Sequence, residues 1–367
     1  MPSVHLVNVS KRYGEIEALD EVNLRIEDGE YVCFIGPSGC GKTTLMKCIA
    51  GITEPTEGEV YIAEELVNDV PIQERGIGYV FQEIALFPHM TVYDNVAYGP
   101  VIRGLSALET RSLVDDMISM MALRERINDP PRVLSGGAQQ KTAIARALAS
   151  GSHLLLLDEP LGSLDAKVRT MLRLELRKMI KDLGLTAVHV THDQEEAMAV
   201  ADKIVVMKAG RIVEVGTPLA LYFRPKRLFT ANFVGEANFM VGEILEKSGD
   251  SVKVKVESGI ISSFEAVDFR EEEKVVVAVR PEFVVMLRSG TGKGSWSGKI
   301  ERKAFAGCAV RYEVRTEGGE QVIVKRPYVS DADTWEVGDR LNLDFPPQSV
   351  LLYPYPEMGL EKEISIE

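Results

Sequence analysis

A glycine-rich segment near the N-terminus has the residue types and spacing of a phosphate-binding loop. The segment GPSGCGKTT contains Gly36, Pro37, Ser38, Gly39, Cys40, Gly41, Lys42, Thr43 and Thr44. Its pattern, G-x-x-x-x-G-K-S/T, lets backbone N–H groups surround a β-phosphate, while Lys42 reaches the β- and γ-phosphates and the Thr43 hydroxyl holds Mg²⁺. A strand-like run, YVCFIG (31–36), precedes the turn, and a helix-like run closed by Gly51 follows it. The segment therefore predicts a nucleotide site.

Two adjacent acids end the apolar run HLLLLDEP (153–160). Such a strand places Asp158 at the carboxyl edge of a sheet, where its carboxylate can orient Mg²⁺ or the waters around it. Glu159 points in a different direction and is the candidate general base that polarises an attacking water. Isolated pairs of acids at strand ends are commonly just solvated, but the apolar run and the upstream glycine loop favour the catalytic interpretation.

Two further polar residues occupy similar strand-end positions. Gln82 follows the run YVF, and His192 follows the run TAVHVT. Asp193 and Glu196 have the D-x-x-E spacing of a capping box, so a helix is expected to begin directly after His192. From these positions Gln82 and His192 are candidates to contact a γ-phosphate, and position alone leaves a purely structural role open for both.

A second turn suited to anions lies further along the chain, in LSGGAQQK (134–141). Ser135 can cap the helix favoured by TAIARALAS, and Gly136 and Gly137 expose backbone N–H groups at the positive end of that helix. The chain thus has two phosphate-binding turns but one set of residues suited to hydrolysis.

The overall composition limits the class of protein. The chain has 367 residues and a formal net charge of −13, and a prior of roughly 150 residues per domain suggests two or three domains. So acidic a protein, without a polybasic stretch, is not expected to bind nucleic acid as its main partner. No run approaches the ~20 apolar residues of a membrane helix, and the N-terminus lacks the pattern of a signal peptide. We expect a soluble protein whose membrane contacts go through another polypeptide.

The cysteine pattern argues against a metal site. Cys33, Cys40, Cys48 and Cys308 form neither C-x-x-C pairs nor combinations with histidine at metal-ligand spacing. We expect small buried or loop residues at these positions, in a reducing compartment.

The chain changes character near residue 235. Up to that point strand-like and helix-like segments alternate, which is typical of an α/β domain with a mostly parallel sheet. The composition between about 88 and 150 predicts a helical insertion, and KIVVMKAGRIVEVG (203–216) predicts a hairpin. After VGEANF, runs such as SVKVKVES alternate at period two, the pattern of an all-β barrel or sandwich. We therefore expect domains at 1–235 and 236–367.

Taken together, the motifs resemble those of the ATP-binding-cassette (ABC) ATPases. The matching segments are GPSGCGKTT, the Gln82 loop, LSGGAQQ, LLLLDEP, SLD (163–165) and VTHD. The resemblance implies a P-loop NTPase sheet with a helical subdomain, ATP and Mg²⁺ as ligands, and ATP hydrolysis. VGEANF and VRPEF resemble the TOBE domain, an OB-like regulatory domain of import ATPases related to those for maltose, polyamines, ferric iron and sulfate.

The resemblance implies roles for residues around the nucleotide. Tyr13 would stack on adenine, with a half-buried strand tyrosine as the alternative. Gln82 would link Mg²⁺ and the attacking water to the helical subdomain, and His192 would sense the γ-phosphate. The metal would then be held by Thr43, Gln82 and Asp158, and catalysis would fall to Glu159, His192 and Gln82.

It also implies residues that contact other chains. Asp165 matches a loop that signals between two active sites. The segment ALFPHMTVYDNVAYG matches the surface that receives a helix of the membrane subunit, although a local core explains its Phe87, Met90 and Tyr93 equally well. Two ATP molecules would lie between the copies of a homodimer, with Ser135, Gly136 and Gly137 binding the partner's nucleotide.

The implied function is that of the ATP-hydrolysing subunit of a binding-protein-dependent importer. Integral membrane permease subunits would be direct partners, a solute-binding protein an indirect one, and the cytoplasmic face of the cell membrane the location. Phe87 favours an inorganic ion or polyamine over a sugar, because tyrosine often replaces this phenylalanine in sugar importers. The signature departs from the family at Ala138 and Lys141, where glutamine and arginine are usual.

Other classes of P-loop protein fit less well. A P-loop kinase or small GTPase has no use for LSGG. A soluble ABC ATPase acting on nucleic acid or ribosomes is the alternative, but such proteins typically have coiled-coil insertions, a second cassette or basic arms, none of which is evident in the sequence.

Overall fold

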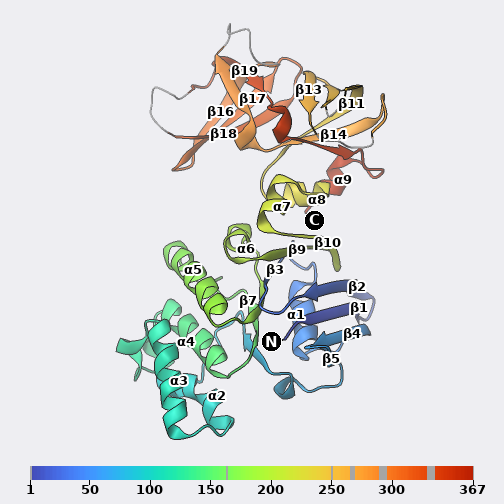
Figure 1. Ribbon diagram of the computed structural model, residues 1–367. Coiled ribbons are helices and arrows are strands. Elements are labelled where there is room, and N and C mark those ends of the chain that lie inside the picture. Colours follow the sequence, from blue (N-terminus) through green and yellow to red (C-terminus); the bar gives the residue numbers. More distant parts are fainter. Residues whose placement is uncertain are drawn as a thin grey trace. The chain divides into compact units, whose positions relative to one another are not determined.

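The computed structural model describes residues 2–162, 164–248, 251–264, 269–288, 296–328 and 335–366. The chain divides into two compact units, Met1–Leu221 and Tyr222–Glu367, and each is best considered by itself (Figure 1). Each unit has its own buried apolar core.

A six-stranded sheet forms the centre of the first unit. Its strands lie in the order β10 (Arg211–Gly216), β9 (Lys203–Lys208), β3 (Tyr31–Ile35), β8 (Thr186–Val190), β7 (Leu154–Asp158) and β6 (Ile77–Val80). Neighbours pair in parallel except β9 and β10, which form the expected hairpin around Ala209 and Gly210. Both turn residues have positive φ, 47° and 78°, as a type I′ hairpin turn requires. Every residue of β3, β7 and β8 is buried, as expected of parallel strands covered on both faces.

An antiparallel sheet packs against one face of the parallel sheet. Its strands lie in the order β2 (Ile16–Ile26), β1 (Val4–Tyr13), β4 (Glu57–Ile62) and β5 (Glu65–Leu66). Side chains alternate between the faces of a strand, so Phe34 of β3 and Leu156 of β7 enter a common core with Leu6 of β1. Helix α1 (Lys42–Ala50) adds Met46 to this core and ends, as expected, at Gly51 with a φ of 77°.

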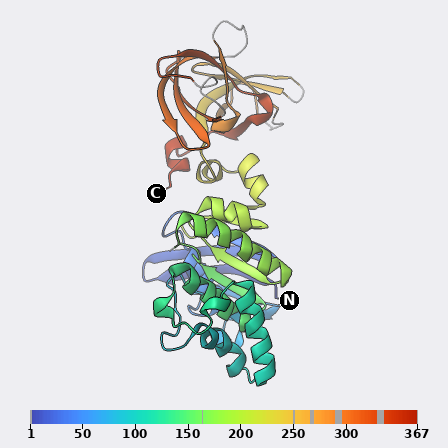
Figure 2. The same cartoon turned by 90° about the vertical axis from the view of Figure 1, so that its left-hand side faces the viewer.

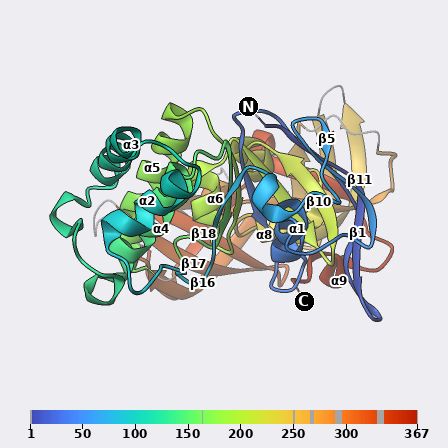
Figure 3. The same ribbon diagram turned by 90° about the horizontal axis from the view of Figure 1, so that it is seen from below.

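A group of helices lies on the side of the first unit opposite the antiparallel sheet (Figures 1 and 3). After the short 3₁₀ helix η1 (Ile72–Glu74) and β6, the chain forms α2 (Val92–Ile102), α3 (Ala107–Met120), η2 (Arg124–Arg126), η3 (Pro131–Val133) and α4 (Gly136–Ala149). Thr91 and Ser106 begin α2 and α3 with complete capping boxes. These helices occupy the segment in which the composition predicts a helical insertion.

Two helices follow the strands that carry the candidate catalytic residues. α5 (Ala166–Asp182) comes after β7, and α6 (Gln194–Val200) comes after β8. The two helices pack together, and α6 also packs on β3. Within the described part of the chain, no helix combines the length and the apolar character needed to cross a membrane.

The second unit consists of two antiparallel sheets around one core. The first contains β13 (Gly259–Ser263), β12 (Ser251–Val256), β11 (Asn238–Ser248), β14 (Lys274–Val279) and β20 (Val350–Pro354) in that order. The second contains β15 (Val285–Arg288), β19 (Arg340–Asp344), β16 (Trp296–Phe305), β17 (Ala309–Thr316) and β18 (Gln321–Pro327), and η4 (Pro281–Phe283) and η6 (Pro347–Ser349) lie in connections. The strands curl around their shared core (Figure 2). The sequence-based expectation of an all-β, OB-like domain is confirmed.

The division between the units falls inside α7 (Pro218–Phe223). The next helix, α8 (Leu228–Phe233), belongs to the second unit, because its Leu228 and Ala231 pack against Val276 of β14 and Tyr353 of β20. The C-terminal helix α9 (Leu360–Ile364) covers the same apolar cluster. The structural division therefore precedes residue 235, where the composition of the sequence changes.

Arg280 joins the two sequence motifs of the second unit. Its guanidinium belongs to VRPEF and donates hydrogen bonds to the carbonyl oxygens of Tyr222, Ala231 and Glu236, the last of which lies in VGEANF. Burial lowers the pKa of this arginine, and the ring of Tyr222 lies 4.6 Å from the guanidinium carbon. The side chain of Arg280 thus joins the motif VRPEF to the motif VGEANF.

Candidate nucleotide site

The glycine-rich loop lies between β3 and α1, as its motif predicts. Lys42 curls back over the loop, and its ammonium donates to the carbonyl oxygens of Gly36 at 2.7 Å and Pro37 at 2.8 Å. Gly41 has a φ of 102°, and a Cβ there would lie 2.5 Å from the Ala18 carbonyl oxygen. This position therefore requires glycine for both its backbone conformation and its close approach to β2. Cys33, Cys40 and Cys48 are buried and Cys308 is exposed in the β16–β17 connection, as expected.

Asp158 lies at the carboxyl end of β7, directly beside the loop. Thr43 donates its hydroxyl to Asp158 Oδ1 at 3.2 Å, and Tyr79 donates to Oδ2 at 3.3 Å. Burial raises the pKa of Asp158, and these two hydrogen bonds oppose the shift. Burial and the neighbouring carboxylate also raise the pKa of Tyr79. Tyr79 was not predicted from the motifs, and its signal in the sequence is its place in β6, the strand that precedes Gln82.

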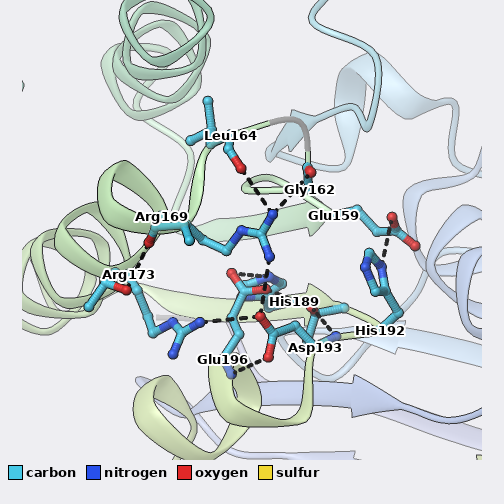
Figure 4. A network of polar contacts seen from close by, with 12 residues as sticks. Glu159, Gly162, Leu164, Arg169, Arg173, His189, His192, Asp193 and Glu196 are labelled. Atoms are coloured by element: carbon cyan, nitrogen blue, oxygen red, sulfur yellow. Dashed lines mark hydrogen bonds and ion pairs between the residues drawn. The ribbon is translucent and has the colours of Figure 1, made fainter. Parts of the chain in front are cut away.

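Glu159 brings together the other two strand-end residues. Its Oε2 accepts a hydrogen bond from Gln82 Nε2 at 3.0 Å. The same oxygen lies 3.2 Å from His192 Nδ1 (Figure 4). Glu159 has a φ of 44°, a left-handed conformation that residues other than glycine adopt rarely and that is often retained at functional sites. Its backbone N–H is bonded to the Val190 carbonyl at 2.9 Å, which fixes the end of β7 against that of β8. Gln82, Glu159 and His192 therefore form one polar group.

Glu159 and His192 border a cleft of about 530 Å³. Its lining comprises Ala18, Ser38, Gly39, Cys40, Gly41, Lys42, Thr43, Thr44, Glu159 and His192. The His192 side chain is 62% exposed, so it is accessible to a ligand in the cleft. Among the described residues, Tyr13 is not part of the lining; it ends β1 with 49% of its surface exposed and has the Lys11 ammonium 5.1 Å from its ring centre.

The second anion-binding turn lies at the start of α4. Ser135 is the N-cap, and its Oγ accepts a hydrogen bond from the Ala138 N–H at 3.3 Å, so the predicted cap is present. Ser135, Gly136 and Gly137 do not line the cleft beside Lys42, as far as the described residues go. Lys141 of α4 forms an ion pair with Glu175 of α5, with Nζ and Oε2 3.2 Å apart. The two anion-binding turns of the chain are therefore separate in the described structure.

A buried polar cluster lies beneath α6. Tyr31 places its hydroxyl 3.0 Å from His189 Nδ1, and His189 Nε2 lies 3.6 Å from Glu196 Oε1. Burial lowers the pKa of His189 to about 3 and raises that of Glu196. The predicted capping box is only half correct: Asp193 caps α6, but the Glu196 carboxylate accepts from the Thr191 hydroxyl at 2.6 Å instead of from the cap backbone.

The aromatic segment after Gln82 contributes both to a local core and to an exposed hollow. Phe87 is half-buried, 4.6 Å from the Tyr98 ring and 5.0 Å from the Arg146 guanidinium. A neighbouring pocket of about 750 Å³ is lined by Met90, Tyr93, Asp94, Ala97, Tyr98, Val101, Ile102, Leu105, Ala107 and Thr110. Phe87 thus belongs to a local packing group, and Met90 and Tyr93 line an exposed pocket.

Comparison with known proteins identifies the family. A model described as "ABC transporter" matches residues 19–162, and one described as "TOBE domain" matches residues 277–352. A maltose/maltodextrin import ATP-binding protein of Vibrio vulnificus is 38% identical over 351 residues, which are 94% of this chain and 93% of that protein. This chain belongs to the ABC transporter family. It is an ABC ATPase: it binds ATP and couples ATP hydrolysis to transport.

Other similar ABC proteins differ in the solute that their names specify. A spermidine/putrescine import ATP-binding protein of Clostridium acetobutylicum is 41% identical over 349 residues, 95% of each chain. An Fe(3+) ions import ATP-binding protein of Rhizobium meliloti is 40% identical over 322 residues, 88% of this chain and 90% of that protein. The relatives share the import ATP-binding function and leave the solute of this chain open.

A solved ABC structure supports the fold of the first unit. A dimeric ATP-binding cassette in a post-hydrolysis state, bound to ADP and phosphate, has a TM-score of 0.53 and 38% sequence identity, covering 59% of this chain and 98% of that one. The expected P-loop NTPase fold is thereby confirmed.

Proposed function

We propose that two copies of this chain form the ATP-hydrolysing core of a binding-protein-dependent importer at the cytoplasmic face of the cell membrane. The observation that carries the proposal is the separation of the two anion-binding turns. One turn borders the cleft with Lys42 and Glu159, and the other, at Ser135, lies outside it. A turn without hydrolytic residues of its own is explained if it binds the γ-phosphate in a partner's cleft.

The cleft suits ATP with Mg²⁺. Lys42 exchanges the Gly36 and Pro37 carbonyls for the β- and γ-phosphates, and the loop N–H groups surround the β-phosphate. The Thr43 hydroxyl, the Asp158 carboxylate and the Gln82 amide oxygen are hard oxygen ligands of the kind that Mg²⁺ prefers. The first two already lie 3.2 Å apart, so these residues fit the metal, which would neutralise charge on the β- and γ-phosphates. Tyr13 is proposed to stack on the adenine.

Glu159 is the proposed general base. Its carboxylate borders the cleft and takes a proton from the water that attacks the γ-phosphate. Gln82 and His192 hold that carboxylate from two sides, and the exposed His192 ring also reaches toward the γ-phosphate. Binding of ATP by both chains closes the dimer, and loss of the γ-phosphate removes one of the contacts that keeps it closed. Asp165, the cap of α5, is proposed to face the partner's site.

The α2–α3 pocket is the proposed contact with the permease. Its lining is largely apolar with Asp94 and two tyrosines, a chemistry that suits the apolar face of a short helix. Helix α4 begins at the Ser135 turn and belongs to the same helical region. A change at the nucleotide would then move this region and, through it, the membrane subunit.

An inorganic ion or a polyamine is the proposed solute. Phe87 supports this choice, whereas the relatives, named for maltose, polyamines and ferric iron, have similar identities to this chain and do not distinguish the solutes. The alternative of an ATPase that acts on nucleic acid or ribosomes is not favoured, because these relatives are named for import.

Reconstitution with the permease tests the proposal. The ATPase rate is measured in proteoliposomes with a panel of solute-loaded binding proteins, and a polyamine- or ion-binding protein should stimulate it. Stimulation by a sugar-binding protein alone would contradict the solute assignment. Recovery of the chain from native membranes with ribosomes or DNA, and never with a polytopic membrane protein, would contradict the importer itself.

A further inference from the structure

Arg169 of α5 holds the backbone that follows Glu159. One terminal nitrogen, Nη2, donates to the Leu164 carbonyl at 2.9 Å and lies 3.5 Å from the Gly162 carbonyl (Figure 4). Gly162 in turn donates its N–H to the Glu159 carbonyl at 3.1 Å. The guanidinium therefore fixes the path of the chain directly beyond the proposed general base.

The same guanidinium also reaches the turn that carries His192. Its other terminal nitrogen, Nη1, lies 3.5 Å from Asp193 Oδ2. The second oxygen of Asp193 accepts the Glu196 N–H at 3.1 Å and so caps α6, which begins at Gln194, two residues beyond His192. The donors of a planar guanidinium fork lie on three separate nitrogens, so it can bridge two carbonyls and a carboxylate over a wider span than the single nitrogen of a lysine ammonium.

Arg173, one helical turn later, provides a natural comparison. Its Nη2 contacts the same Asp193 oxygen at 3.3 Å. Within the described part of the chain it makes no hydrogen bond to the Gly162 or Leu164 carbonyl. Both arginines thus neutralise Asp193, but Arg169 alone of the two also holds the backbone after Glu159.

The energetic value of the Arg169–Asp193 pair is small. The two side chains are 27% and 21% exposed, and at 3.5 Å the contact is long. Solvent-accessible pairs of this kind contribute little to stability. The Arg169–Asp193 pair therefore affects the positions of side chains more than stability. The two segments that it joins carry Glu159 and His192, whose side chains lie 3.2 Å apart.

We propose that Arg169 is a positioning residue that couples the Gly162 and Leu164 carbonyls to the His192 turn. A displacement of the backbone before Asp165 is passed through the guanidinium to Asp193, and from there to the contact between His192 and Glu159. The proposal rests on the catalytic roles proposed above for these two residues. According to this proposal, the placement of the catalytic side chains depends on Arg169, and the binding of ATP does not.

The test compares Arg169→Gln with Arg173→Gln in the full chain, assembled with its permease. Steady-state ATPase rates give kcat and KM, and equilibrium binding of a fluorescent ATP analogue gives Kd. For Arg169→Gln we expect kcat to fall about 10- to 100-fold, because a small misplacement of catalytic groups has this effect, while Kd changes less than about threefold. For Arg173→Gln both constants should stay within about threefold of wild type.

A lysine variant separates geometry from charge. Arg169→Lys keeps the charge beside Asp193 but lacks the fork, so its kcat should fall like that of Arg169→Gln. If Arg169→Gln does not fold, as judged by its melting temperature, the lysine variant supplies the comparison. The proposal is overturned if the folded Arg169 variants keep the wild-type kcat. It is also overturned if Arg173→Gln loses as much kcat as Arg169→Gln does. Glu159→Gln, measured in parallel, tests the underlying catalytic assignment: full activity there would refute that assignment instead.

Discussion

Glu159 Oε2 lies 3.2 Å from His192 Nδ1, although 33 positions separate the two residues in the sequence. The contact exists because β7 and β8 are adjacent parallel strands, with Asp158 opposite Val190 in their register. Each polar residue follows the end of its strand, so both side chains emerge at one edge of the sheet. The first prediction concerns the carboxylate at this contact.

Replacing Glu159 with glutamine should nearly abolish turnover and preserve ATP binding. The amide has the shape of the carboxylate but cannot take up a proton, so kcat should fall about 100-fold or more. Phosphate release measures kcat, and size-exclusion chromatography with ATP and Mg²⁺ should show an accumulated dimer. Hydrolysis at the wild-type rate would remove Glu159 from the role of general base.

Replacing Asp158 with asparagine should weaken the response to Mg²⁺. The change removes one negative charge from the group that includes the Thr43 hydroxyl, so the Mg²⁺ concentration for half-maximal ATPase activity should rise about tenfold or more. Tyr79→Phe is the matched control, because it removes the other hydrogen bond to Asp158 and leaves all three proposed ligands in place. An equal shift in both variants would argue that Asp158 has only a structural role.

Replacing Ala138 with glutamine should change the interaction between two nucleotide-bound copies. The glutamine adds a side-chain amide in the first turn of α4, beside the Ser135 cap, where it can donate to a partner's phosphate. Helix propensities of the two residues are similar, so the melting temperature should stay nearly constant. We expect kcat or the ATP-dependent dimer dissociation constant to change by about threefold or more. If neither changes, the departure at Ala138 is neutral.

Replacing Arg280 with methionine should destabilise the second unit. The change leaves the carbonyls of Tyr222, Ala231 and Glu236 without their buried donor, at an expected cost of about 3 kcal/mol or more. Trp296 and Trp335 are the chain's two tryptophans, so fluorescence during urea unfolding reports on this unit. Arg302→Met, at a side chain that is 79% exposed, should cost less than about 1 kcal/mol. Equal costs would contradict the bridging role of Arg280.

Acid should destabilise the first unit through His189. Its pKa is about 3 in the folded chain and 6.5 as the ordinary value, so the unfolded chain binds more protons between these pH values. The stability that neutral His189 contributes is fully present above pH 6.5 and is lost as the pH falls toward 3. Glu196 acts in the opposite sense, because its pKa is raised: its contribution is present below pH 4.5 and is lost as the pH rises.

The variant His189→Gln isolates the histidine contribution. Melting temperatures followed by circular dichroism between pH 7 and 5 should fall less in the variant than in the wild type. When the free energy of unfolding is plotted against pH, the slopes of the two proteins differ by at most about 1.4 kcal/mol per pH unit, which corresponds to one proton. Parallel curves would show that His189 is not the group responsible.

Much of the candidate site could be predicted because its signals are local in the sequence. Glycine spacing determines the loop that ends in Lys42 and Thr43, and apolar runs place Asp158 at the end of a strand. Ser135 caps α4 as expected, because a side-chain oxygen satisfies a free N–H two or three positions later wherever a helix begins. Such features depend on a few neighbouring residues and on backbone geometry that is the same in every protein.

Contacts between distant segments were decided only by the tertiary structure. The order of the parallel strands brings Tyr79 to Asp158, and the packing of α5 on α6 brings Arg169 to Asp193. The capping-box pattern predicted a bond from Glu196 to the cap backbone, but in the folded chain its carboxylate meets Thr191. The sequence by itself thus determined which groups stand at the ends of strands and helices. Which of these ends meet depends on how apolar faces pack, and that is a property of the whole core and not of any one segment.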